Sequence, residues 1–199
     1  MNAVQLFALL TAAALVLTTN VVDASPSYAK DERASVRPSP AIRFIHSQMC
    51  VDVPRKSKAN GVRLQQYPCR SGTRADTWNQ RWGFLCVEHC NGSEGGRYYI
   101  VRNANSKLCM KVAGGSEQPG AKVIQSSNCN SDSSRWALIP CDGVSSSKGT
   151  SGRVYSLKNK KGYATLDVPG RSLAAGTKLI QYSPKACFYT NEMFELVNP

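Results

Sequence analysis

An all-β fold of three repeats, the β-trefoil, is the architecture that the sequence predicts, and three observations point to it. No window sustains the 3.6-residue apolar period of a long helix, whereas short β-prone runs such as 41–45, 98–101, 154–157 and 178–182 lie between Gly and Asn residues. One set of motifs recurs three times in the same order, and each unit ends with a large aromatic residue. Three such units of short strands can close into a barrel without exposed sheet edges.

The repeat begins with a first-strand motif, which reads CVDV at 50–53, CMKV at 109–112 and TLDV at 165–168. A Gly and then a basic residue precede an apolar strand in each unit, at 61–64, 120–123 and 176–179. The aromatic that ends each unit is Trp82, Trp136 or Phe194. We interpret these aromatics as core residues, because packing best explains a large apolar side chain at equivalent places in all three units.

Residues 1–24 are predicted to be a cleaved signal peptide. Leu6 to Leu17 is an uncharged apolar run that is shorter than the roughly 20 residues of a transmembrane helix, and Val22 and Ala24 precede a suitable cleavage position. Residues 25–40 are rich in Ser, Pro and charge and are predicted to be a flexible segment. The trefoil is expected over 41–199, with repeats at about 41–90, 91–145 and 146–199, in a secreted, extracellular protein without a membrane span.

The chain is basic, with a formal net charge of +12, but its Lys and Arg residues are scattered, with no block of five or more. Such an excess fits either a well-solvated surface or attraction to acidic glycans or an anionic cell surface. Nucleic acid is not an expected partner, because a secreted chain without a recognisable basic helix or an aromatic stacking platform does not fit that role.

The motifs of the first repeat resemble the ricin B-chain type of lectin, the R-type β-trefoil family with Gln-x-Trp repeats. They read CVDV at 50–53, NG at 60–61, LQQYPC at 64–69 and NQRW at 79–82. The resemblance covers about 41–199, and this ordered set is far more specific than a lone Gln-x-Trp would be. It implies one shallow sugar pocket in each repeat, usually for galactose or N-acetylgalactosamine.

In the first repeat the resemblance assigns a role to five residues. Asp52 accepts hydrogen bonds from sugar hydroxyls, Tyr67 stacks on the pyranose ring, and Asn79 contacts a ring hydroxyl. Gln80 steadies the aspartate, and Gln65 is the glutamine on the strand of the aromatic residue. These residue types suit a sugar, which has one face of C–H groups and a rim of hydroxyls, and therefore needs an aromatic surface beside a charged acceptor and an amide.

The second and third repeats depart from this pattern. In the second, Lys111 replaces the aspartate and serines replace the other contacts (Ser126, Ser133 and Ser134), so no sugar binding is expected there. The third keeps three of the residues, Asp167, Tyr182 and Asn191, but has Ile180, Glu192 and Phe194 in place of Gln, Gln and Trp. Glu192 either repels Asp167, which would raise a pKa and weaken the pocket near neutral pH, or points to solvent.

The even number of cysteines in a secreted chain indicates disulfides rather than a metal site, including at Cys86 and Cys90 beside His89. The resemblance implies the pairs Cys50–Cys69 and Cys109–Cys129. Thr165 replaces the corresponding first Cys of the third repeat, so the other four cysteines allow three pairings. We favour Cys86–Cys90 with Cys141–Cys187, and Cys86–Cys141 stays open. Asn91, in the sequence Asn-Gly-Ser, is a candidate glycosylation site.

The function predicted from these features is carbohydrate binding by a secreted, monomeric lectin, through the first pocket and in part the third, on galactose-type glycans or a cell-wall polysaccharide. The alternative is a secreted effector, toxin subunit or inhibitor that binds a protein. Catalysis is not expected, because Asp52 and Asp167 occupy equivalent, distant places in a threefold fold and cannot act as paired carboxylates. No cofactor or metal is expected either.

Overall fold

The computed structural model describes residues 39–92, 96–144 and 152–198. The predicted signal peptide, and the predicted flexible segment as far as residue 38, lie outside the described residues. Strands follow one another in three groups of four: β1 (Ala41–Phe44), β2 (Met49–Asp52), β3 (Gln65–Pro68) and β4 (Trp82–Glu88), then β5 (Tyr98–Asn103), β6 (Cys109–Val112), β7 (Val123–Ser126) and β8 (Arg135–Pro140), then β9 (Val154–Asn159), β10 (Leu166–Asp167), β11 (Ile180–Gln181) and β12 (Met193–Val197).

Short helical turns occupy the same two places in every group. One follows the second strand, as η1 (Pro54–Lys56), η4 (Ala113–Gly115) and η6 (Pro169–Arg171). The other precedes the fourth strand, as η2 (Trp78–Gln80), η5 (Asp132–Ser134) and η7 (Thr190–Glu192), with the short helix α1 (Arg74–Thr77) leading into η2. Over the described ranges, no helix has the length and hydrophobicity needed to cross a membrane.

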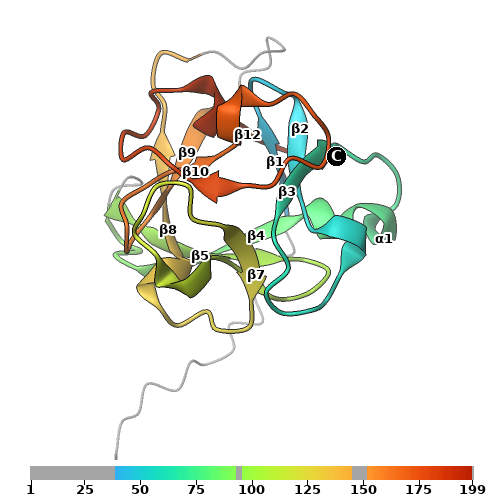
Figure 1. Ribbon diagram of the computed structural model, residues 1–199, viewed down its shortest axis with the longest axis horizontal. Helices are drawn as coiled ribbons and strands as arrows, with labels where there is room; N and C mark the ends of the chain where they lie inside the picture. Colours follow the sequence, from blue (N-terminus) through green and yellow to red (C-terminus); the bar gives the residue numbers. More distant parts are fainter. Residues whose placement is uncertain (1–38, 93–95, 145–151, 199) are drawn as a thin grey trace, which may run out of the picture. The chain divides into compact units, whose positions relative to one another are not determined.

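The first and fourth strands of the three groups form a closed barrel (Figure 1). Antiparallel pairing runs from β1 to β12, β9, β8, β5 and β4 in turn. A bridge between Ala41 and Arg81 then joins the start of β1 to the residue before β4. The ring therefore has no free edge among these six strands, as predicted for three repeats that close into a barrel.

The second and third strands form three hairpins that meet around the threefold axis. The backbone N–H of Leu64 donates to Val123 O (2.9 Å), Val123 to Leu179 O (3.2 Å) and Leu179 to Leu64 O (3.0 Å), which makes a ring of three equivalent hydrogen bonds. The preceding glycines, Gly61, Gly120 and Gly176, all have a positive φ between 80° and 84°. Glycine is required there because other residues rarely adopt this left-handed conformation.

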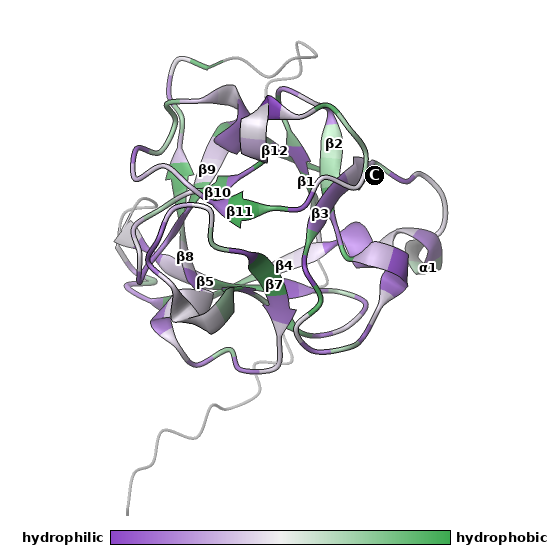
Figure 2. Ribbon diagram, viewed as in Figure 1, coloured by the Kyte–Doolittle hydropathy of each residue, from purple (hydrophilic) through white to green (hydrophobic). Residues whose placement is uncertain are grey.

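The main hydrophobic core fills the space between barrel and hairpins, and Trp82, Trp136 and Phe194 are fully buried in it, as predicted. The indole N–H of Trp82 donates to Val51 O, and that of Trp136 donates to Met110 O, both at 3.0 Å. Val51 and Met110 are equivalent residues of the motif that begins each repeat. Figure 2 shows the hydrophobic colouring of β2 and β11, two strands that border this core. The chain is therefore a β-trefoil of three repeats.

The structure has four disulfides, Cys50–Cys69, Cys86–Cys90, Cys109–Cys129 and Cys141–Cys187. The structure thus has Cys86 paired with Cys90 and not with Cys141. In the third repeat Thr165 fills the place of the missing Cys and is buried, and its hydroxyl lies within hydrogen-bond distance of Ser183 O.

Candidate functional site

In each repeat a surface pocket lies at the end of the second strand. The first-repeat pocket, of about 340 Å³, is lined by Asp52, Pro54, Arg55, Gln65, Tyr67, Arg70 and Lys178. The third-repeat pocket, of about 320 Å³, is lined by Asp167, Pro169, Gly170, Arg171, Ile180, Tyr182, Tyr189 and Asn191. The second-repeat pocket, of about 440 Å³, is lined by Lys111, Gly114, Gly115, Ser131, Asp132, Ser133 and Lys161. The three pockets occupy equivalent places in the fold but differ in the charged, polar and aromatic residues that line them.

In the first-repeat pocket three amide groups hold the carboxylate of Asp52 in one orientation. Asn79 Nδ2 and Gln80 Nε2 donate to Asp52 Oδ1, at 2.7 and 3.1 Å, and Gln65 Nε2 donates to Asp52 Oδ2 at 2.9 Å. Each carboxylate oxygen can accept about two hydrogen bonds, so Oδ2 keeps an acceptor position for a ligand. The acceptor is therefore fixed before any ligand arrives.

Burial and hydrogen bonding act in opposite directions on Asp52. Its burial raises the pKa, while hydrogen bonds from Gln65, Gln80 and Asn79 and the charge of Arg70 lower it. Burial has the larger effect, so the pKa of Asp52 lies above its usual value.

The side chain of Asn79 lies next to Asp52 and not in the lining of the pocket. It is fully buried, and Nδ2 donates to both Asp52 and the Val53 carbonyl, at 3.1 Å in the latter case. Asn79 and Gln80 are absent from the pocket lining. In this arrangement Asn79 orients the acceptor, and its predicted contact with a ring hydroxyl stays a prediction.

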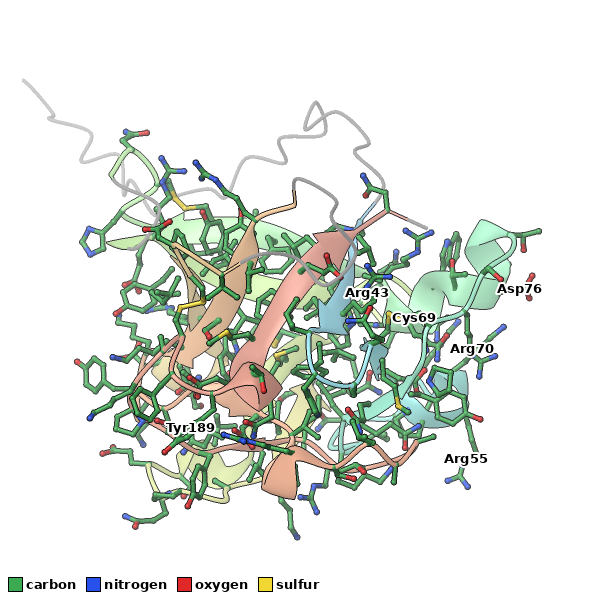
Figure 3. The ribbon with its side chains drawn as sticks, turned by 90° about the horizontal axis from the view of Figure 1, so that it is seen from above. Arg43, Arg55, Cys69, Arg70, Asp76 and Tyr189 are labelled. Carbon is green, nitrogen blue, oxygen red and sulfur yellow. A yellow bond between two sulfur atoms is a disulfide. The ribbon has the colours of Figure 1, made fainter. Side chains whose placement is uncertain are left out.

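Tyr67 offers the aromatic surface of the first-repeat pocket, and it is partly exposed. The guanidinium carbon of Arg70 lies 5.7 Å from its ring centroid. From the third repeat, Lys178 reaches the pocket and donates from Nζ to Gln65 Oε1 at 2.6 Å. Together with Arg55, these cations form a rim around Asp52, and Figure 3 shows Arg55 and Arg70 on the same side of the molecule.

The second-repeat pocket has no carboxylate at the equivalent place, where Lys111 stands. Ser126 and Ser134 are buried, and the Asp132 carboxylate on the rim pairs with Arg135 at 3.0 Å and with Lys160 at 3.2 Å. Nothing aromatic lines this pocket. It cannot provide the combination of acceptor and stacking surface that the first-repeat pocket has.

The third-repeat pocket keeps the acceptor but holds it with fewer donors. Asn191 Nδ2 donates to Asp167 Oδ2 at 2.8 Å and to Val168 O at 3.0 Å, as Asn79 does in the first repeat. Ile180 supplies no donor where Gln65 stands in the first repeat. Tyr182 is 53% exposed, and Tyr189 lies under the Arg171 guanidinium, 5.4 Å away. Two aromatic side chains, Tyr182 and Tyr189, therefore line this pocket, whereas the first-repeat pocket has Tyr67 alone.

Glu192 is buried and does not point to solvent, which excludes one of the two predicted alternatives. Its Oε1 accepts the backbone N–H groups of Phe188 (2.7 Å) and Tyr189 (3.1 Å), and its Oε2 accepts the Thr165 hydroxyl at 2.8 Å. Burial and then the charge of Glu192 raise the pKa of Asp167 to about 7. The third-repeat acceptor is therefore only partly ionised at neutral pH.

Several residues that line the pockets were not predicted as site residues from the sequence, among them Arg55, Arg70, Lys178 and Tyr189. Arg55 and Arg70 lie within three residues of a predicted site residue, which is the only signal that marks them. Lys178 comes from another repeat. Among the described residues, no group of three His, Cys, Asp or Glu side chains could hold a metal ion. Asn91 is exposed, and Ser93 of its glycosylation motif lies outside the described residues.

A family model described as a ricin-type β-trefoil lectin domain-like domain matches residues 78–182. The comparison with curated proteins found no match.

Solved structures share the fold. ThreeFoil, a designed threefold-symmetric protein, is 27% identical with a TM-score of 0.63, over 80% of this chain and 98% of ThreeFoil. The exo-β-1,3-galactanase 1,3Gal43A from Clostridium thermocellum is 20% identical with a TM-score of 0.64, over 81% of this chain but 30% of the enzyme. The Macrolepiota procera ricin B-like lectin in complex with lactose is 14% identical with a TM-score of 0.54, over 81% of this chain and 97% of the lectin.

Proposed function

Because the chain belongs to the ricin-type β-trefoil lectin domain-like family, we propose that it is a secreted lectin that binds galactose-type sugars, mainly through the first-repeat pocket and more weakly through the third. The observation that carries this proposal is the Asp52 carboxylate, which three amides hold beside the exposed ring of Tyr67. Secretion is inferred from the predicted signal peptide and fits the four disulfides.

The contacts of the first-repeat pocket match the two chemical faces of a pyranose. The fixed carboxylate can accept a hydrogen bond from a ring hydroxyl at its free Oδ2 position, and such a bond is charge-assisted and therefore stronger than a neutral one. The C–H face of the ring can pack on Tyr67 once the Arg70 side chain, which is exposed, moves aside. Galactose is favoured as the sugar type by the family resemblance and by the lactose complex of the Macrolepiota procera lectin.

The proposed mode of action is binding without catalysis. Asp52 and Asp167 belong to separate pockets, so they do not form the carboxylate pair that glycoside hydrolysis requires. A shallow monosaccharide site typically has a Kd of about 1 mM, which corresponds to about −4 kcal/mol. Useful affinity would come from two pockets on one chain that engage a clustered glycan.

The test compares Asp52→Asn with wild type by glycan array and by calorimetric titration with methyl β-galactoside. The substitution keeps the size of the side chain but removes the charged acceptor, so galactoside affinity at the first-repeat pocket should fall about tenfold or more. Asp142→Asn is the matched control, because Asp142 is exposed and lines none of the three pockets. Equal binding by Asp52→Asn and wild type would refute the assignment of this pocket.

A further inference from the structure

We propose that the preferred ligand of the first-repeat pocket is an acidic sugar, whose hydroxyls bind Asp52 and whose carboxylate or sulfate group binds the cationic rim of Arg55, Arg70 and Lys178. This inference rests on the proposed function and names its substrate class.

The charges that line the first-repeat pocket do not balance. Three cations surround a single carboxylate, that of Asp52. Some basic side chains of the described ranges have carboxylate partners: Arg43 pairs with Glu195, and both Arg135 and Lys160 pair with Glu88. In contrast, no ion pair within the described ranges includes Arg55, Arg70 or Lys178. An anionic ligand would supply the missing partner.

The position of Lys178 shows how the cations affect one another. It is held at the pocket by its hydrogen bond to Gln65 Oε1, the same glutamine that orients Asp52. Burial lowers its pKa, the nearby charges of Arg63 and Arg55 lower it further, and only Asp52 acts in the opposite direction. The ammonium group therefore lies in a field that is already positive, which a bound anion would relieve.

Arg55 occupies a backbone conformation that favours glycine. It follows Pro54 in η1 with φ 54° and ψ 25°, and the equivalent residues of the other two repeats, Gly114 and Gly170, have φ 63°. The first repeat thus carries a large cation where the other two carry glycine. A strained residue that projects into a ligand pocket is an arrangement often associated with binding.

Arg70 lies over Tyr67, on the surface that a sugar ring would use. A neutral sugar that stacks on Tyr67 displaces the Arg70 guanidinium and offers it no charged partner. A sugar with a carboxylate or sulfate group offers the displaced guanidinium a bidentate partner, which is the geometry that arginine favours. The pocket should therefore discriminate between acidic and neutral sugars of the same ring configuration.

The experiment measures the Kd of three probes by calorimetry: methyl β-galactoside, methyl galacturonide and methyl galactoside 6-sulfate. Wild type is expected to bind at least one acidic probe about tenfold more tightly than the neutral one, and to lose this preference as salt rises. The two acidic probes distinguish a carboxylate from a sulfate ester.

The variants are Arg55→Gly, Arg70→Gln and Lys178→Gln, with Arg102→Gln as the matched control. Arg102 is exposed on β5 and lines none of the three pockets. Arg55→Gly introduces the residue of the other two repeats, so it should fold normally. Each rim variant should lower the ratio of acidic to neutral affinity several-fold, and Arg102→Gln should leave it unchanged.

The outcomes separate the two proposals. Equal affinity of wild type for acidic and neutral probes, with loss of both in Asp52→Asn, overturns the acidic preference and leaves the lectin assignment intact. An acidic preference that Arg102→Gln lowers as much as the rim variants do also overturns it, because the general positive charge of the surface would then explain it. No binding of any probe overturns both proposals.

Discussion

The third-repeat pocket should bind sugar more strongly at neutral and mildly acidic pH when Glu192 is replaced by Gln. The substitution introduces the residue that the first repeat has at the equivalent position, Gln80. The amide oxygen can still accept the N–H groups of Phe188 and Tyr189. The amide nitrogen can donate to Thr165 Oγ1, and the Thr165 hydroxyl proton is then free to donate to Ser183 O. The variant should therefore fold, although one buried negative charge is gone.

The magnitude follows from the ionisation of Asp167. With a pKa of about 7, this carboxyl group is charged above pH 7 and becomes protonated as the pH falls. If only the charged form binds well, wild-type affinity is reduced about twofold at pH 7 and about tenfold at pH 6 relative to alkaline pH. Removing the charge of Glu192 lowers the pKa of Asp167, but burial still keeps it above its usual value. Gains of up to about twofold at pH 7 and tenfold at pH 6 are therefore upper limits.

The assay is galactoside titration of the third-repeat pocket between pH 5.5 and 9, in an Asp52→Asn background that removes the contribution of the first-repeat pocket. Glu117→Gln serves as the control, because Glu117 is exposed and lines none of the three pockets. The curves for Glu192→Gln and its parent should meet at pH 9 and separate as the pH falls to 7 and below. Identical pH profiles would refute the explanation that Glu192 limits ionisation of Asp167.

Two further predictions concern stability. Replacing both Cys141 and Cys187 by Ser should lower the free energy of unfolding by about 4 kcal/mol, and replacing both Cys86 and Cys90 by Ser should lower it by about 2 kcal/mol. The difference is expected because the first bridge spans 46 residues and the second spans 4. Guanidinium denaturation measures both losses, and equal losses would contradict the loop-entropy explanation. Arg55→Gly should raise the melting temperature, by an amount that corresponds to at most about 1–2 kcal/mol, since it removes a non-glycine residue from a left-handed conformation. A lower melting temperature in calorimetry would show that the Arg55 side chain stabilises the fold more than its backbone strain destabilises it.

The fold could be predicted from the sequence because the residues that recur in each repeat are residues that pack in the core. The recurring motif that we expected on the first strand lies on the second strand of each repeat, and the closing aromatic lies on the fourth. Both contribute side chains to the core at equivalent places, so threefold recurrence in the sequence corresponds to threefold recurrence in space. The three glycines before the third strands were equally informative, since their positive φ values serve the hydrogen-bond ring at the axis.

The candidate site could be predicted only in part. Asp52, Gln65 and Tyr67 meet in one pocket because β2 and β3 pair in register, with Asp52 opposite Gln65. The cationic rim was not predictable, because Lys178 enters from the third repeat through a contact that no local motif records. The orientation of Glu192 was also undecided by the sequence, since it depends on two backbone N–H groups that only the folded loop presents.

The account depends on Asp52 and Tyr67 acting together on one sugar ring, and a crystal structure of the protein with methyl β-galactoside tests this most directly. We expect a ring hydroxyl within hydrogen-bond distance of Asp52 Oδ2, the C–H face on Tyr67, and the Arg70 guanidinium moved away from the Tyr67 ring. A galactoside bound at a surface that includes neither Asp52 nor Tyr67 would contradict the account.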